Sequence, residues 1–338
     1  MADSPDPWVV LSLAPAPPER VRGWFAGIDR LDLRFPAERT RAAVHVAIED
    51  ADIVIPDWSS ALRVARPEVE AAGRLAFVMS ASVGLDSLDV PALTEAGVVI
   101  ANPAGLNAQS VAEWCLAAAF AVARALVWVD REVRAGAWPQ LELPERGTAE
   151  LGGRRVGVVG FGAVGGRVAR LFTAIGCEVR YWSRRPRPAE EGNGAIWSDL
   201  DTLIAGSEVL VVNLALTDET RGLLDARRLA LLPAGAILVD ASRGGIVDLD
   251  ALIQLIDAGR LRGAALDVFA TEPLPMDAPV RRSDRILLSS HAAAATAESV
   301  GRIFALVRSN VAGAIAGESV ASVVNGLGPI IVRRGVAR

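Results

Sequence analysis

Short, uniformly apolar segments recur along the chain and constrain its fold more than any other feature. In the first hundred residues they are WVVLSL, DIVIP, RLAFVMSA and GVVIAN; from residue 154 onward they are RRVGVVG, CEVRYWS, EVLVVN, GAILVDAS, GAALDVF and ILLSS. Helix-like stretches separate them, for example 36–48 and 89–96. Strands that are apolar on both faces are typical of a parallel sheet covered by helices. We therefore predict an α/β protein with two Rossmann-like domains built on parallel sheets.

Length and composition agree with two domains and exclude several classes of protein. The chain has 338 residues, 51% of them hydrophobic, which exceeds what one core usually holds. The net charge of −5 comes from well-mixed acidic and basic residues, so we expect no nucleic-acid partner. Cys115 and Cys177 have no metal-ligand spacing and argue against a disulfide framework, which favours a cytoplasmic location.

The most apolar window of the chain, VAEWCLAAAFAVARALVWV, contains Glu113 and Arg124. These charges favour a buried helix over a membrane span. We predict one long helix over about 107–135 that joins the two α/β units, and no association with a membrane.

A glycine motif indicates a dinucleotide-binding turn. Gly160, Gly162 and Gly165 form G-x-G-x-x-G in RRVGVVGFGAVGGRVARLFTAIG, directly after a valine-rich strand and before an amphipathic helix. The first glycine permits the turn, the second lets the backbone approach a pyrophosphate, and the third lets the helix pack against the strand. The alternative is a methyltransferase-like Rossmann sheet that uses this loop for another nucleotide.

The end of the next strand bears on the choice of cofactor. NAD is usually held by a carboxylate about 20 residues after the motif. Here Ser183, Arg184 and Arg185 occupy that position, and the segment contains no acid. A hydroxyl and two guanidiniums suit a phosphate dianion, so we expect NADP(H) to be favoured over NAD(H). The alternative is a solvated basic turn.

Three further segments place polar residues at predicted strand ends. They are VDASRGGIVD with Arg243, LDVFATEPLP with Asp267 and Glu272, and LLSSHAAAAT with His291. The carboxyl ends of parallel strands meet at one edge of a sheet, where ligands bind, so these side chains can converge. For His291 alone, two interpretations are open: a helix start with Ser290 near the cap, or a proton donor whose alanine neighbours exclude water.

Together these segments make the chain resemble the D-isomer-specific 2-hydroxyacid dehydrogenases over roughly residues 50–325. The resemblance also rests on SVGLDSLDVPALTEAGVVIANPAGLNAQSVAEWCLA and LTDETRGLL. SVGLD and SRRPRP look most like the glyoxylate/hydroxypyruvate reductases. The resemblance implies a flavodoxin-like substrate domain, formed by 1–102 and 289–338, with its C-terminal helix starting at about 289. It also implies an inserted NAD(P)-binding Rossmann domain at 103–288.

The resemblance also implies the roles of the site residues. Arg243 would bind the carboxylate of a small 2-keto acid and polarise its keto oxygen, and His291 would donate a proton to that oxygen. Glu272 would orient His291 and keep it protonated. The N–H groups of Val83 and Gly84 would hold the substrate carboxylate from the other domain. The product would be a D-2-hydroxy acid.

The cofactor contacts that the resemblance implies lie in five segments of the inserted domain, and no metal is implied. They are Gly160, Gly162, Ala163, Val164, Gly165, Ser183, Arg184, Arg185, Ala215, Thr220, Ala241, Ser242 and Asp267. The chain departs from the family at Ser290, where proline usually precedes the histidine, and in NLALT, where Asn213 and Ala215 replace His-x-Pro. These changes put the nicotinamide contacts in question. Val83 stands where phosphite-oxidising relatives carry a lysine, which argues against that substrate.

Segment 136–153, which contains Trp138, lacks clear periodicity and is either an interdomain linker or a dimer arm. We expect a homodimer. Two other functions stay open: a dinucleotide-sensing binding protein like the corepressor relatives, and a specialised secondary-metabolism reductase acting on an unusual acid, such as one bearing a phosphonate.

Overall fold

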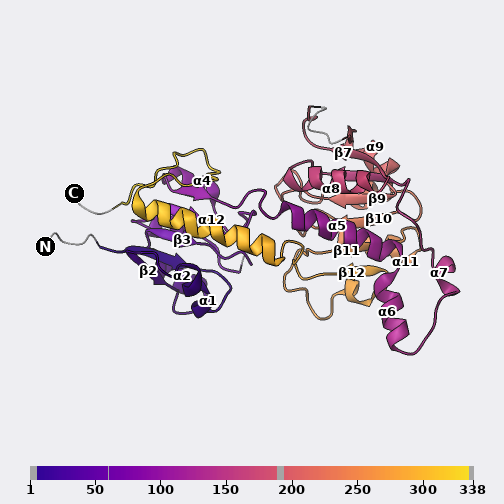
Figure 1. The fold of residues 1–338 in the computed structure, drawn as a ribbon, viewed down its shortest axis with the longest axis horizontal. Helices are drawn as coiled ribbons and strands as arrows, with labels where there is room; N and C mark the ends of the chain where they lie inside the picture. The colour runs from indigo at the N-terminus through magenta and orange to yellow at the C-terminus, as the bar shows by residue number, and fades with distance from the viewer. Residues whose placement is uncertain (1–5, 60, 189–193, 335–338) are drawn as a thin grey trace. The chain divides into compact units, whose positions relative to one another are not determined.

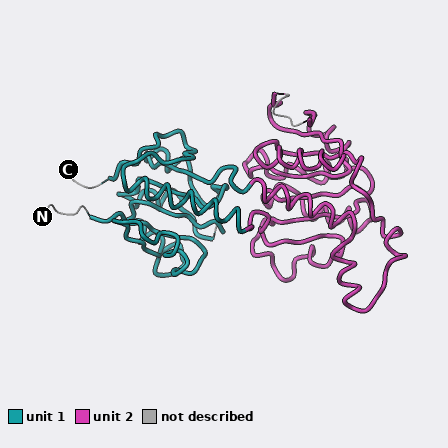
Figure 2. The backbone as a smooth tube through the Cα atoms, in the orientation of Figure 1, with its two compact units in different colours: residues 1–107, 297–338 teal, residues 108–296 magenta. Residues whose placement is uncertain are grey.

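The computed structural model describes residues 6–59, 61–188 and 194–334 (Figure 1). The chain divides into two compact units: unit 1 consists of residues 1–107 and 297–338, and unit 2 of residues 108–296 (Figure 2). The divisions therefore lie after Asn107 and Thr296, where the resemblance implied boundaries after 102 and 288. The terminal residues of the predicted substrate domain, 1–5 and 335–338, lie outside the described residues.

Unit 1 is built on a five-stranded sheet in the order β2-β1-β3-β4-β5, with all neighbours parallel. The strands are β1 (Trp8–Ser12), β2 (Leu31–Arg34), β3 (Ile53–Ile55), β4 (Phe77–Met79) and β5 (Val99–Ala101). Four of them match predicted apolar runs. The edge strand β2 was not predicted, because its sequence LDLR alternates apolar and charged residues and is too short to stand out.

Helices cover both faces of this sheet, so successive side chains of its inner strands are buried in two different cores (Figure 1). Val10 packs in the same core as α1 and α12, whereas its neighbour Leu11 packs with α2, α3 and α4. The helices are α1 (Pro18–Trp24), α2 (Arg41–Ile48), α3 (Arg66–Ala71), α4 (Val90–Glu95) and α12 (Ala297–Ala316). The expected start of the C-terminal helix at about residue 289 is therefore wrong by eight residues.

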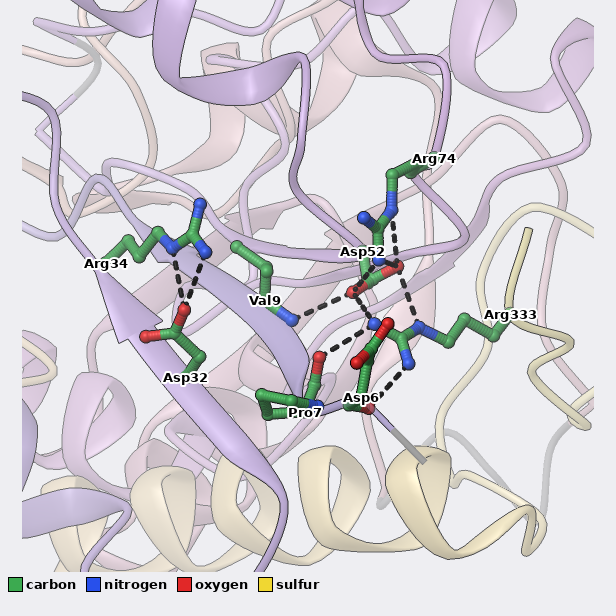
Figure 3. A network of polar contacts seen from close by, with 8 residues as sticks. All are labelled: Asp6, Pro7, Val9, Asp32, Arg34, Asp52, Arg74 and Arg333. Atoms are coloured by element: carbon green, nitrogen blue, oxygen red, sulfur yellow. Dashed lines mark hydrogen bonds and ion pairs between the residues drawn. The ribbon is translucent and has the colours of Figure 1, made fainter. Parts of the chain in front are cut away.

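A buried carboxylate ties the C-terminal segment of unit 1 to its sheet (Figure 3). Asp52, which is fully buried, pairs with Arg333 at 3.0 Å and with Arg74 at 3.2 Å, and accepts the Val9 N–H at 2.8 Å. Arg333 also donates to the carbonyl oxygens of Asp6 and Pro7. Each carboxylate oxygen therefore has partners, as a buried charge requires.

Unit 2 is built on a seven-stranded parallel sheet in the order β12-β11-β10-β9-β6-β7-β8. The strands are β6 (Arg155–Val159), β7 (Glu178–Trp182), β8 (Ile196–Trp197), β9 (Val209–Val212), β10 (Ile237–Asp240), β11 (Gly263–Leu266) and β12 (Ile286–Leu288). All were predicted except β8, a two-residue edge strand with exposed side chains. The predicted α/β class with two parallel sheets is thus confirmed.

The helices of unit 2 cover both faces of its sheet. One core contains residues of α5 and α8, and the opposite core contains residues of α9, α10 and α11. The helices are α5 (Ala108–Ala123), α6 (Leu126–Arg134), α7 (Glu142–Glu145), α8 (Ala163–Ala174), α9 (Leu200–Gly206), α10 (Ala226–Leu229) and α11 (Leu249–Asp257). Both cysteines are buried and form no disulfide.

The single helix predicted over 107–135 is wrong. Ala125 adopts a left-handed conformation, with φ of 50°, and the chain bends by 60° between α5 and α6. Within the described ranges no single helix is long and apolar enough to cross a membrane; only the bent pair α5 and α6 reaches the necessary length and composition together. The segment that follows is not a plain linker, since it contains α7 and places Leu151 in the core of unit 2.

Candidate active site

The candidate active site lies at the carboxyl-end edge of the seven-stranded sheet. Arg243 follows β10, Asp267 follows β11, and His291 follows β12, and these strands are adjacent in the sheet. Parallel strands present their carboxyl ends to the same edge, which is where open α/β sheets bind ligands. The structure therefore gathers the three strand-end segments that the sequence singled out.

A histidine and a glutamate form the centre of the site. The Nδ1 atom of His291 lies 2.8 Å from Oε2 of Glu272, and Oε1 of Glu272 accepts the Phe269 N–H at 2.9 Å. Burial raises the pKa of Glu272, but hydrogen bonds from His291 and Phe269 and the charges of His291 and Arg243 outweigh it, so the net shift is downward. The carboxylate is ionised and fixed, and it occupies Nδ1 of His291. The Nε2 atom is left to exchange a proton with a substrate.

Asp267 fixes the turn that carries the histidine. Its side chain is buried, and its two oxygens accept the N–H groups of Ala292 at 2.8 Å and Ala293 at 2.9 Å. Its carbonyl oxygen accepts the His291 N–H at 2.7 Å. Since these bonds occupy its carboxylate, the structure gives Asp267 a positioning role that the sequence did not indicate, beside the nicotinamide contact that the resemblance implied.

The interpretation of the SSHAAAAT segment as a helix start is wrong. No helix begins there, because residues 289–296 form a loop with a turn at 293–294, and α12 starts only at Ala297. His291 has φ of 56°, a conformation outside any right-handed helix. Its side chain is 40% exposed.

A second buried carboxylate supports the Arg243 turn. Asp240, the last residue of β10, accepts hydrogen bonds from both the N–H and the hydroxyl of Ser242. Arg243 donates from Nη1 to the Ser242 carbonyl oxygen at 2.8 Å. Burial raises the pKa of Asp240 to about 7, although the Ser242 bonds and the Arg243 charge oppose the rise. Sequence reasoning missed Asp240; its only signal is an acidic residue at the end of the apolar run GAILVDAS.

The glycine loop fits a dinucleotide. A side chain at Gly160, which has φ of 97°, would collide with the Asn213 carbonyl, and one at Gly165 would collide with the Gly160 carbonyl. A Cβ at Gly162 would meet no atom within 4 Å, so the backbone is open there to an approaching pyrophosphate. Ala163 and Val164 begin α8, whose amino terminus favours an anion. These residues would hold a dinucleotide.

The turn after β7 differs from its sequence-based interpretation in one respect. Arg184 pairs with Glu219 at 3.2 Å, so an acid does lie beside the two arginines. Both side chains of this pair are largely exposed. Ser183 donates its hydroxyl to the Arg185 carbonyl at 2.6 Å, which orders the turn.

The other implied cofactor contacts belong to loops that follow β9 and β10. Thr220 donates its hydroxyl to the Ala215 carbonyl at 2.7 Å, and Ala241 and Ser242 form the turn after β10. The Nδ2 atom of Asn213, where the family usually has histidine, is buried without a hydrogen-bond partner in the described part of the chain. No cluster of described His, Cys, Asp or Glu side chains could hold a metal ion.

The implied substrate loop lies in unit 1. The Val83 carbonyl accepts the Asn102 side chain at 2.7 Å, and the Gly84 carbonyl accepts the Ser82 hydroxyl at 2.7 Å. These bonds fix the loop through its carbonyl groups. No hydrogen bond joins the N–H groups of Val83 and Gly84 to the parts of the chain that the structure describes.

The chain is similar in sequence to known proteins. Residues 116–293 match the family model described as D-isomer specific 2-hydroxyacid dehydrogenase, NAD binding domain. The chain is 36% identical over 304 residues to a D-3-phosphoglycerate dehydrogenase of Mycobacterium leprae, covering 90% of this chain and 56% of that relative. It is also 36% identical over 259 residues to a glyoxylate reductase of Aeropyrum pernix, covering 75% of this chain and 77% of the relative.

Solved structures show the same two-domain fold. The TT0316 protein of Thermus thermophilus superposes with a TM-score of 0.81 at 29% identity, covering 94% of this chain and 99% of that one. This chain thus spans little more than half of the mycobacterial relative, but most of the glyoxylate reductase and of the structural neighbour. With more than half of its residues matched by the family model, the chain belongs to the D-isomer-specific 2-hydroxyacid dehydrogenase family.

Proposed function

We propose that the protein reduces a small 2-keto acid, of the glyoxylate or hydroxypyruvate type, to the D-2-hydroxy acid with NADPH. The observation that carries this proposal is the bond between His291 and Glu272, 2.8 Å long, at the sheet edge where Arg243 also lies. This pair is a proton donor with a fixed anionic partner, and the arginine is a planar cation that matches a carboxylate.

Each residue has a distinct task in this reaction. Arg243 binds the substrate carboxylate and polarises the keto oxygen. His291 donates the proton from Nε2 to that oxygen, and Glu272 stabilises the imidazolium before the transfer. A nicotinamide cofactor, held by the glycine loop, would supply the hydride that the carbonyl carbon receives. Asp267 holds the backbone after His291, and so fixes the direction from which the proton arrives.

Support for the substrate comes from the loop in unit 1 and from the relatives. The N–H groups of Val83 and Gly84 form no hydrogen bond to the described parts of the chain, so they can donate to an anion such as a carboxylate. The Aeropyrum pernix relative is named a glyoxylate reductase, whereas the mycobacterial relatives are named D-3-phosphoglycerate dehydrogenases. The sequence of this chain is 36% identical to both relatives. We therefore propose only what the two reactions share, which is a 2-keto acid as the substrate that is reduced.

The preference for NADPH rests on Ser183, Arg184 and Arg185. A bond from one arginine to the ribose 2′-phosphate contributes about 1.5 to 3 kcal/mol when well formed. Arg184 is 80% exposed and pairs with Glu219, which reduces its contribution. We therefore place the preference for NADPH at roughly tenfold.

Steady-state turnover of the wild-type protein tests the proposal directly. NADPH and NADH are each assayed with glyoxylate, hydroxypyruvate and larger 2-keto acids, and the configuration of the product is determined. We expect turnover of at least one acid, a D product and a lower KM for NADPH. Tight cofactor binding without turnover of any acid would instead support a dinucleotide-sensing protein.

A turn variant tests the cofactor preference separately. Replacing Ser183 with Asp and both arginines with Gln should weaken NADPH binding by about tenfold and leave NADH binding unchanged. Arg180→Gln is the matched control, because it removes an exposed arginine on β7 away from the turn. An equal loss of affinity for both cofactors in the turn variant would show that these side chains do not bind the 2′-phosphate.

We also propose that two copies associate through α6 and the segment after it. Several large apolar side chains are exposed there: Leu126, Val127, Val133, Trp138 and Leu141. Such a patch on one helix and its arm favours a protein partner. Sedimentation velocity should give a dimer, and Trp138→Ala with Leu141→Ala should shift it toward monomer. A wild-type monomer at micromolar concentration would refute this association.

A further inference from the structure

A cavity of about 150 Å³ lies in unit 2, at the opposite end of the strands from the active site. Arg262 directly precedes β11 and Arg285 directly precedes β12, whereas Asp267 and His291 follow the same strands. The end of α5, the start of α6 and residues 146–148 complete its wall. The cavity is therefore separate from the site described above, and the reaction does not use it.

Its lining is strongly cationic. It contains four arginines, Arg131, Arg146, Arg262 and Arg285, against one acid, Asp284. Asp284 lies 2.8 Å from Arg146 and 4.0 Å from Arg131, so it is already engaged. Arg146 also stacks on the Trp128 ring, with its guanidinium 4.2 Å from the ring centroid, which holds it in place. The cavity wall therefore has an excess of three positive charges.

Arg262 and Arg285 form no ion pair with any carboxylate in the described ranges. The Nη1 atom of Arg262 is buried and has no hydrogen-bond partner there, and it packs against Gly147. Burial and the charges of Arg154 and Arg285 lower the pKa of Arg262. A half-buried guanidinium with a buried, unpaired donor beside a second guanidinium is costly unless an anion binds to both.

We propose that this cavity binds a small oxyanion of the phosphate class, held by Arg262 and Arg285. Guanidiniums present donors in a fork that matches the oxygens of a phosphate group. An ion of this size fits, since an engineered cavity of about 150 Å³ holds a benzene molecule. The bound anion would link the amino ends of β11 and β12 to the segment around Arg146 and Gly147, and so stabilise unit 2.

Thermal unfolding with inorganic phosphate tests this site. It is measured at constant ionic strength against NaCl, with saturating NADPH so that the glycine loop is occupied. At phosphate ten times above its Kd, Tm should rise by about 3 to 6 °C. Arg285→Gln and Arg262→Lys should each weaken phosphate binding at least tenfold, while kcat stays unchanged. Arg282→Gln, an exposed arginine outside the cavity, is the control and should respond like wild type.

The two arginine variants distinguish a phosphate site from a contact with a second copy of the chain. Arg285→Gln removes a side chain that has no ion pair in the described ranges, so it should fold and give a usable melting curve even if Arg262→Lys does not. An equal response to phosphate in wild type and both variants would overturn the proposal. So would a phosphate-insensitive wild type whose dimer dissociates on Arg262→Lys in sedimentation velocity, because a carboxylate of a second copy would then be the occupant.

Discussion

Two buried aspartates, one in each sheet, show how differently the two ends of parallel strands are used. Asp52 directly precedes β3 at the amino end, and two arginines and a backbone N–H surround its carboxylate. Asp240 ends β10 at the carboxyl end, where Ser242 is its hydrogen-bond donor, and burial raises its pKa to about 7. The amino end neutralises its charge for stability. The carboxyl end keeps a carboxyl group with a raised pKa beside Arg243, and such shifted pKa values are frequent at functional sites.

Of the residues in this comparison, Arg243, the cation beside Asp240, should have the largest effect. Arg243→Gln should lower kcat/KM for the 2-keto acid by roughly 10² to 10³, because one stabilising donor at the developing oxyanion is lost. Arg34→Gln removes an arginine of comparable charge from an exposed pair in unit 1 and should leave turnover unchanged. Steady-state kinetics of both variants checks the contrast. Similar kcat/KM values would place the substrate carboxylate elsewhere.

Asp52 should matter for stability and not for chemistry. Asp52→Asn leaves Arg74 and Arg333 without their shared anion and should lower the free energy of unfolding by about 2 to 4 kcal/mol. The exposed pair of Asp32 and Arg34 is the control, and Asp32→Asn should cost less than about 0.5 kcal/mol. Urea unfolding monitored by fluorescence measures both. An Asp52→Asn protein as stable as wild type would show that the network in Figure 3 is energetically neutral.

Asp240→Asn should raise the free energy of unfolding, whereas Asp52→Asn lowers it. The pKa of Asp240 is about 7 in the folded protein, higher than its ordinary value of 3.8. Between pH 3.8 and pH 7 its carboxyl group is therefore protonated in the folded protein and ionised in the unfolded chain. Stability of the wild type therefore falls as pH rises from about 4 to about 7, and the Asn variant escapes this loss. Over this pH range, we expect the free energy of unfolding of the variant to rise by about 1 to 3 kcal/mol relative to that of the wild type. A difference that does not change with pH would mean that Asp240 is ionised throughout.

The smallest effect concerns the pH profile of reduction. The pKa of Glu272 is lowered, so its carboxylate is ionised at every pH above its ordinary value of 4.5 and continues to stabilise the imidazolium of His291. Glu272→Gln removes that negative partner, so the decline of kcat with rising pH should move to lower pH. Rates measured from pH 5 to 9 give this shift. Identical profiles would reduce Glu272 to a structural role.

The buried strands could be predicted from the sequence, whereas the edge strands, the bend at Ala125 and the conformation of His291 could not. Apolar runs predicted ten of the twelve strands in the described ranges, because burial on both faces leaves a clear signal, whereas β2 and β8 at sheet edges leave almost none. The bend at Ala125 and the left-handed His291 depend on tertiary contacts that no helix propensity records. The hydrogen bonds of Asp267 to the alanine turn, and the cavity that gathers Arg131, Arg146, Arg262 and Arg285, join residues distant in sequence.

The most direct test of the central claim uses the only two histidines of the chain, His291 after β12 and His45 in α2 of unit 1. The measurement is the single-turnover rate of NADPH oxidation at saturating 2-keto acid, for His291→Ala and His45→Ala. We expect His291→Ala to slow this rate by roughly 10² to 10⁴ with unchanged NADPH affinity, and His45→Ala to match wild type. A His291→Ala rate within a few-fold of wild type would contradict the assignment of His291 as the proton donor.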